Sequence, residues 1–190
     1  MQALTQYRDV LLRDIASLDT ATLDWQPVAS AVSIGTGLLH IAAVEFLVMT
    51  SVALARDSSA SAIDLDVWNA LRPGFARELD EFPCQDKPLT HYLQWLERVR
   101  ATTLVELARE SRPIDLDQAL SAVLAQLDLD PAKRDRLLAP LGLPFSVVAG
   151  AEPTSLVLVL IAHESYHRGQ ITQTAFRYRL QRDSNADAVK

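Results

Sequence analysis

The chain has a single cysteine, Cys84, among its 190 residues. It therefore cannot form an internal disulfide, and it cannot build a cysteine zinc finger or an iron–sulfur site. Glycine and proline are also scarce, with 6 and 9 residues. So few turn-forming residues favour long helices over many short strands. With 49% apolar and 22% charged residues, a chain of this length is expected to fold as one globular domain covering residues 1–190.

Basic residues are outnumbered, with 18 Lys and Arg against 24 Asp and Glu, which gives a net charge of −6. Nucleic-acid binding depends largely on a basic face that neutralises phosphates, so we expect no nucleic-acid partner. Charged Arg8 and Asp9 lie where an export signal would need its apolar stretch. We therefore expect a cytoplasmic protein.

One long apolar run covers residues 34–55, and Glu45 is its only formal charge. A run of this length is sufficient to span a bilayer. However, His40 and Glu45 would both lie at membrane depth, and no basic flank marks an orientation. We interpret the run as the central helix of a soluble bundle and expect no membrane partner.

Segments between the prolines carry apolar residues with a helical period. Long helices are expected over about residues 4–18, 33–56, 89–110 and 153–182. Residues 60–87 are expected to be a loop with one short helix around Trp68 and Phe75–Leu79. In the first long helix, the expected buried face is Tyr7, Val10, Leu11, Ile15 and Leu18. Four long helices with crossover connections predict an all-α four-helix bundle.

Residues 113–150 are expected to form a short helical insertion between the third and fourth long helices. One helix is expected over residues 116–127, and another opens at Asp130-Pro131 as cap and first helical residue. The insertion is expected to end in a turn-rich stretch containing Gly142, Pro144 and Gly150.

Histidine placement points to a metal site. His163 and His167 are four residues apart, so on a helix they share one face with Cβ atoms about 6 Å apart. Both imidazoles can then reach one ion at about 2.0–2.1 Å. His40, from a facing helix, can supply a third ligand and leave an open coordination position, as in catalytic sites. His91 is expected to be an ordinary core or surface histidine.

The run from His163 to His167 also spells the H-E-x-x-H pattern of zinc metalloproteases, in which the glutamate is the general base. No glutamate or histidine follows His167 to act as the usual third ligand, and the metzincin continuation is absent. No strand is expected that would bind an extended peptide. We therefore interpret Glu164 as an i,i+4 partner of Arg168 and keep an H-E-x-x-H metallohydrolase only as an alternative.

Three residues beside the histidines are candidates for supporting the ligands or contacting a substrate: Gln170, Tyr166 and Glu164. Gln170 lies about one turn beyond His167 and can point toward the cavity. Tyr166 lies about 100° around the helix from His167, so we expect it to pack between helices.

Two further residues on these helices have structural interpretations. Glu45 lies about 140° around its helix from His40, so a buried ion pair is expected rather than metal ligation. Gly169 within a helix costs about 1 kcal/mol relative to alanine, and close approach of another helix is its expected purpose.

The chain resembles the DinB/YfiT-like superfamily of metal-dependent enzymes in two motifs. The first is Ser33-Ile34-Gly35 followed by Leu39-His40-Ile41-Ala42 and Glu45, after a similar Trp25-Gln26-Pro27 lead-in. The second, more specific motif is His163-x-x-x-His167-Arg168-Gly169-Gln170-Ile171. The resemblance covers all four expected long helices.

The resemblance implies an up-down-down-up four-helix bundle in which three histidines bind a divalent metal ion, commonly nickel or zinc. Those ligands map onto His40, His163 and His167. Imidazole ligands also accept iron, so the ion is expected to be nickel, zinc or iron. The 113–150 insertion departs from the compact family pattern, and it affects the expected shape of the substrate pocket rather than the metal site.

Members of this superfamily include transferases and isomerases that use a low-molecular-weight thiol such as bacillithiol, mycothiol or glutathione, and related bundles are often homodimers. The resemblance thus implies a thiol transferase or isomerase acting on a small-molecule substrate. A metal-bound water would equally support hydrolysis. A non-catalytic, stress-related metal-binding bundle is the alternative. An open pocket over the metal favours catalysis, whereas a fully ligated metal favours a structural role.

Overall fold

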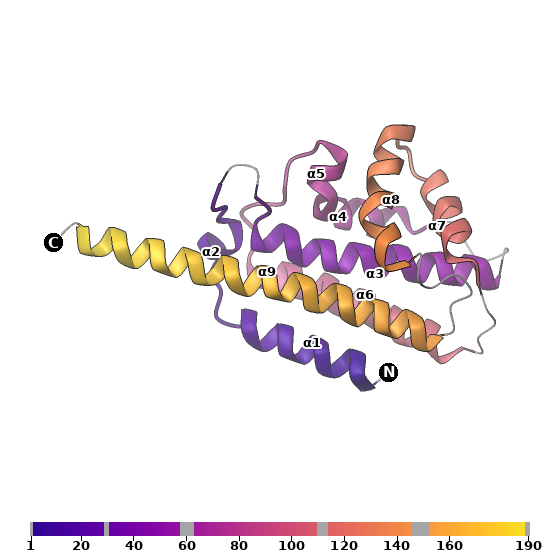
Figure 1. Ribbon diagram of the computed structural model, residues 1–190, viewed down its shortest axis with the longest axis horizontal. Coiled ribbons are helices and arrows are strands. Elements are labelled where there is room, and N and C mark those ends of the chain that lie inside the picture. Colours follow the sequence, from indigo (N-terminus) through magenta and orange to yellow (C-terminus); the bar gives the residue numbers. More distant parts are fainter. Residues whose placement is uncertain (1, 29–30, 58–62, 110–113, 146–152, 189–190) are drawn as a thin grey trace.

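The computed structural model describes residues 2–28, 31–57, 63–109, 114–145 and 153–188. Within these ranges every regular element is a helix, so the all-α prediction is confirmed. Four long helices lie lengthwise beside one another, as Figure 1 shows. They are α1 (Gln2–Ile15), α3 (Ile34–Arg56), α6 (Leu89–Ala108) and α9 (Pro153–Ala188).

The ends of the long helices follow local signals in the sequence. Ser33 caps α3 by accepting a hydrogen bond from the Thr36 backbone N–H at 3.2 Å. Pro88 directly precedes α6, and Pro153 is the first residue of α9. Helix α9 continues to Ala188, beyond the expected end near Arg182, and its last turns extend past the other helices in Figure 1.

Helix α3 is the core helix of the chain. It is long and apolar enough to cross a membrane, but 67% of its most apolar window is buried inside the protein, as expected for a central helix. It packs against α6 and α9. Gly35 makes one of these contacts possible, because the Tyr92 ring of α6 occupies the space that a Cβ at position 35 would need.

Short helices connect the long ones. They are α2 (Thr20–Asp24), α4 (Leu65–Leu71), the 3₁₀ helix η1 (Arg72–Phe75), α5 (Ala76–Leu79), α7 (Leu116–Ala125) and α8 (Pro131–Phe145). The connector after α1 contains a helix that was not expected, although Asp19 caps it through the Thr22 N–H at 2.8 Å.

The region between α3 and α6 is more helical than the expected loop, because α4, η1 and α5 follow one another there. Helix α8 begins at Pro131 as predicted but continues to Phe145. The expectation that Gly142 and Pro144 form a turn is therefore wrong. A proline inside a helix removes one backbone hydrogen bond, and here that loss does not end the helix. Gly150 lies outside the described residues.

A buried ion network joins the four long helices. Arg8 of α1 contacts Glu45 of α3 and Glu164 of α9, both at 2.9 Å. Arg100 of α6 contacts the same two glutamates, both at 2.7 Å. These arginines also donate to helix carbonyls, Arg8 to Leu96 at 2.7 Å and Arg100 to the α1 backbone at 2.6 Å. Two cations and two anions therefore balance one another in the interior.

The network corrects two expectations and confirms a third. Glu45 is in a buried ion pair, as predicted. Glu164 does not pair with Arg168, which instead contacts Asp14 at 2.6 Å, because Glu164 faces inward and is only 2% exposed. Tyr7 is 44% exposed, and the polar residue next to it, Arg8, takes the inward position.

Replacing Glu45 with glutamine is expected to lower the free energy of unfolding by about 3–5 kcal/mol, because two buried arginines would lose one of the two anions that they share. Chemical denaturation monitored by circular dichroism measures this change. The control is Asp14→Asn, which removes the partly exposed pair with Arg168 and is expected to cost less than about 1 kcal/mol. Equal effects of the two substitutions would contradict a special role for the network.

Candidate metal centre

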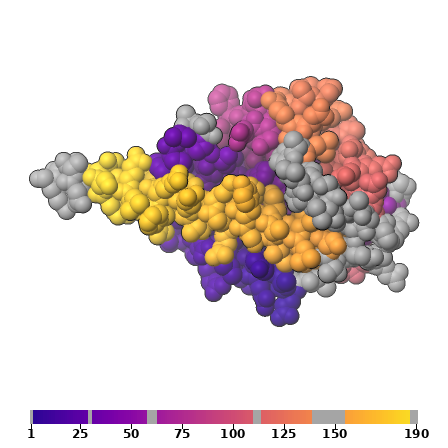
Figure 2. All heavy atoms as spheres, viewed as in Figure 1, coloured from indigo at the N-terminus to yellow at the C-terminus, as the bar shows by residue number. Residues whose placement is uncertain are grey.

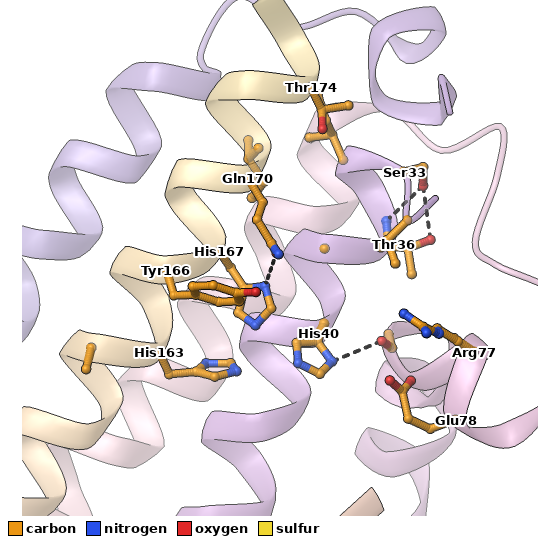
Figure 3. A pocket seen from close by; sticks show the side chains of 16 residues that line it. Ser33, Thr36, His40, Arg77, Glu78, His163, Tyr166, His167, Gln170 and Thr174 are labelled. Carbon is orange, nitrogen blue, oxygen red and sulfur yellow. Dashed lines mark hydrogen bonds between the residues drawn. The ribbon is translucent and has the colours of Figure 1, made fainter. Parts of the chain in front are cut away.

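Three histidines from two helices meet at one point. His40 comes from α3, whereas His163 and His167 come from successive turns of α9. One ring nitrogen from each lies within 4.8 Å of the others. Ring centroids are 5.3 Å apart for His40–His163, 4.7 Å for His40–His167 and 4.5 Å for His163–His167. The structure thus brings together the three residues predicted as ligands, and Figure 3 shows their rings converging.

The histidines line an open pocket of about 600 Å³. Its walls come from the N-terminal turns of α3, from η1 and α5, and from the middle of α9. The other lining residues are Val32, Ser33, Ile34, Thr36, Gly37, Gly74, Arg77, Glu78, Ala162, Tyr166, Gln170, Ile171 and Thr174. Most of the surface that these residues present to the pocket is apolar, although many of them carry a polar group, as in small-molecule sites.

A backbone carbonyl orients His40. The Nδ1–H of His40 donates to the Gly74 carbonyl at 3.2 Å, which leaves Nε2 as the nitrogen available to a ligand. Gly74 is required for this contact, because a Cβ there would lie 2.6 Å from the His40 backbone nitrogen. The glycine of η1 thus lets the loop approach α3 closely enough to hold the imidazole.

A side-chain amide orients His167 in the same way. The Nδ1–H of His167 donates to Gln170 Oε1 at 2.8 Å, which again leaves Nε2 available. Gln170 also lines the pocket, so it points toward the cavity, as predicted. Two of the three imidazoles therefore have one nitrogen engaged by the protein, an arrangement typical of metal-binding histidines.

Burial keeps the histidines neutral. Desolvation, reinforced by the neighbouring histidines, lowers the pKa of His40 to about 3 and that of His163 to about 2. Desolvation also lowers the pKa of His167, partly offset by its hydrogen bond to Gln170. At neutral pH all three are unprotonated, which is the form that binds a metal. Three neutral nitrogens facing one point fit a divalent ion of the borderline class.

The structure separates the other candidate residues. Glu164 lies in the buried ion network and does not line the pocket, so it cannot act as the general base of an H-E-x-x-H hydrolase. Tyr166 lines the pocket but is 65% exposed, so the expectation that it packs between helices is wrong. Its ring lies edge-on to His167 with centroids 5.0 Å apart, on the solvent side of the site.

Sequence reasoning missed two charged residues of the pocket. Arg77 and Glu78 lie on α5, where a short helix is expected within the loop of residues 60–87, and Figure 3 shows their side chains on the pocket wall facing the histidines. Among the described lining residues, Arg77 is the only arginine or lysine and Glu78 the only carboxylate. Two adjacent residues of opposite charge do not form a recognisable motif, so only the fold identifies Arg77 and Glu78 as pocket residues.

Comparisons with known proteins agree with the histidine motifs. The family model of the DinB superfamily matches residues 3–171, a range that includes all three histidines. No curated protein and no solved structure matches the chain. The resemblance to this superfamily is therefore confirmed.

Each of His40→Ala, His163→Ala and His167→Ala is expected to lower the metal content sharply, because losing one of three protein ligands removes a large part of the coordination energy. Elemental analysis of protein purified without an affinity tag measures the content. His91→Ala is the control and is expected to retain the metal, since His91 is outside the group. A full metal equivalent in His40→Ala would contradict the site.

Gln170→Ala is expected to weaken metal affinity by about 10–100-fold, because His167 loses the partner that fixes its tautomer and ring orientation. Competition with a chromogenic chelator measures the affinity. Gln181→Ala, an exposed glutamine on the same helix, is the matched control. Unchanged affinity in Gln170→Ala would show that the hydrogen bond does not support a ligand.

Proposed function

The chain belongs to the DinB superfamily, and we propose that it is a metal-dependent enzyme in which His40, His163 and His167 hold one divalent ion. The observation that carries this proposal is the convergence of three neutral imidazoles, within 4.8 Å of one another, on the wall of an open pocket. Their nitrogen donors fit nickel, zinc or iron. Three protein ligands leave room for a further ligand from the pocket, which favours catalysis over a structural role.

We further propose that the enzyme is a transferase or isomerase that uses a low-molecular-weight thiol and acts on a small molecule. When bound, a divalent ion lowers the pKa of a coordinated thiol or water and so supplies a nucleophile near neutral pH. A cavity of about 600 Å³ is the size of a small-molecule site. Reduced thiols of this kind are abundant in the cytoplasm, and we place the protein there.

The charged residues of α5 have distinct roles in this proposal. Glu78 is the carboxylate of the described pocket wall, and it accepts the proton that the thiol loses. Arg77 attracts an anionic group of the substrate or the thiol. Gln170 and Gly74 are positioning residues, because they hold the histidines and leave one nitrogen of each ring free.

The remaining parts of the proposal concern the whole molecule. Its four long helices are connected in up-down-down-up order within one domain, and residues 113–150 are a helical insertion in that domain. Its acidic net charge of −6 favours small-molecule substrates over nucleic acid. The burial of most of α3 favours a protein without a membrane partner.

The experiment is a thiol-conjugation screen on metal-loaded protein. Several biological thiols are each paired with electrophilic small molecules, and loss of free thiol is followed against time. Turnover is expected with at least one thiol, and it is expected to disappear in His40→Ala and to persist in His91→Ala. Metal retention without turnover by any thiol would favour the non-catalytic metal-binding bundle.

Glu78→Gln tests the proton acceptor. The substitution is expected to lower kcat by about 10²–10⁴-fold and to remove the carboxylate limb from the pH–rate profile, while metal content stays unchanged. Glu97→Gln, on α6 and outside the pocket, is the matched control. An unchanged pH profile in Glu78→Gln would exclude Glu78 as the proton acceptor.

A further inference from the structure

The pocket wall contributed by α5 carries a cation without a partner. Arg77 lines the pocket, and within the described parts of the chain its side chain forms no ion pair and no hydrogen bond. Its neighbour Glu78 lines the same wall, yet the two side chains do not pair with each other. A guanidinium held ready on the wall of a small-molecule pocket is suited to bind an anionic group of a ligand.

A buried threonine on the same wall has a hydrogen to donate. Thr36 lines the pocket and is 4% exposed. Its backbone N–H donates to Ser33 Oγ at 3.2 Å, and the Ser33 hydroxyl donates in turn to Thr36 Oγ1 at 3.0 Å. Among the described residues, nothing accepts the hydrogen of the Thr36 hydroxyl itself. Since a buried donor without an acceptor is costly, a ligand oxygen in the pocket would stabilise this group.

Arg77 and Thr36 lie on one side of the cavity. In the view of Figure 3, the Arg77 guanidinium lies between Thr36 and Glu78, across the cavity from Gln170 of α9. Neither Arg77 nor Thr36 forms a hydrogen bond with the three histidines. We call Arg77 and Thr36 together the anion subsite.

Contacts on both sides of Arg77 fix the backbone that carries it. Helix α5 is only four residues long and would not be stable in isolation. Asp80, which ends α5 in the left-handed conformation, contacts Arg136 of α8 at 2.7 Å. Before Arg77, the Gly74 carbonyl accepts the hydrogen bond from His40. Binding an anion therefore requires ordering of the Arg77 side chain rather than of the whole segment.

The charges on this wall favour a carboxylate over a phosphate monoester. A carboxylate carries one negative charge, and its two oxygens can accept parallel hydrogen bonds from one guanidinium. A phosphate monoester carries nearly two negative charges at neutral pH. The described lining residues offer one arginine to neutralise it, with the Glu78 carboxylate beside that arginine. A dianion would therefore be only partly neutralised and would be repelled by Glu78.

Exposed apolar side chains lie at the mouth of the same pocket. Tyr166 and Val32 both line it and are 65% and 44% exposed. Figure 2 shows α9, which carries Tyr166, at the surface along most of its length. A Cβ added at Gly169 would meet nothing within 4 Å among the described residues, so the expectation that Gly169 admits a neighbouring helix is wrong. A side chain at position 169 would lean toward Tyr166, so the glycine leaves that ring accessible to a ligand.

We infer that the pocket binds a small amphipathic carboxylate, whose carboxylate group pairs with Arg77 and Thr36 while its apolar body lies against Tyr166 and Val32. The inference rests on the proposed function, because it takes the pocket of the metal centre as the substrate site. It goes further by naming the class of molecule. Either the small-molecule substrate or the thiol can carry this carboxylate.

Isothermal titration calorimetry on the metal-loaded protein, without thiol, tests the class. The probes are phenylacetate, its neutral amide phenylacetamide, and the dianion benzyl phosphate. Phenylacetate is expected to bind about 10–100-fold more tightly than phenylacetamide, because a charge-assisted hydrogen bond replaces a neutral one. Benzyl phosphate is expected to bind more weakly than phenylacetate. No binding of phenylacetate at millimolar concentration, equal binding of the amide, or tighter binding of the phosphate would overturn the inference.

Arg77→Gln is expected to lower the affinity for phenylacetate to that for phenylacetamide and to leave the affinity for the amide unchanged. The matched control is Arg179→Gln, which removes the same charge from an exposed position outside the pocket and is expected to keep the preference. Thr36→Val is expected to weaken phenylacetate binding, whereas Thr36→Ser keeps the hydroxyl and the affinity. A preference for phenylacetate that persists in Arg77→Gln would overturn the subsite.

Removal of the metal separates this inference from the proposed function. The preference for phenylacetate is expected to persist in chelated protein, because Arg77 and Thr36 are not among the metal-binding histidines. Loss of the preference on chelation would show that the ion binds the carboxylate and would overturn the subsite. A protein that distinguishes the probes but turns over no thiol would contradict the proposed reaction and still support the subsite. Displacement of phenylacetate by saturating glutathione would assign the carboxylate to the thiol, and simultaneous binding would assign it to the other substrate; both results support the subsite.

Discussion

Two arginines and two glutamates in contact fix how the four long helices sit against one another. Arg8, Glu45, Arg100 and Glu164 come one from each helix, and each is at most 6% exposed. Taking four charges out of water is costly, and only the full set of contacts offsets that cost. A shift of any one helix along its axis would leave a buried charge unpaired. The network therefore selects one register of the helices, while the apolar residues around α3 supply most of the burial.

The same alignment of the four long helices positions the metal centre. Glu164 directly follows His163 in the chain, so the contacts that hold Glu164 against α1 and α6 also set the position of the histidine turn on α9. His40 is held independently, through Gly74 of the segment between α3 and α6. The glutamate of the H-E-x-x-H run thus supports the fold, and the histidines on either side of it face the pocket. The carboxylate that we propose for proton transfer is a different one, Glu78 on the pocket wall.

Helix α9 serves three environments at once. One side faces the ion network, another carries His163 and His167 into the pocket, and a third presents Leu158, Phe176 and Leu180 to solvent. A helix with three such faces has no single apolar side, so its hydrophobic pattern alone does not show which residues are buried. Tyr166 lies where the pocket side and the solvent-exposed side meet, so it does not pack between helices as its position on the helix predicts.

The sequence by itself determined the all-helical fold, the approximate bounds of the four long helices and the histidine set of the candidate site. These features follow from local signals in the sequence. The signals are the positions of prolines and helix caps, the recurrence of apolar residues every three to four positions, and the spacing of His163 and His167. Tertiary structure alone decided which way Glu164 faces, that Arg8 is buried beside an exposed Tyr7, and that Gly74, Arg77 and Glu78 reach the pocket. Those outcomes depend on contacts between residues far apart in the chain. Neither the periodicity of apolar residues nor the spacing of a motif indicates which distant residue a side chain will contact.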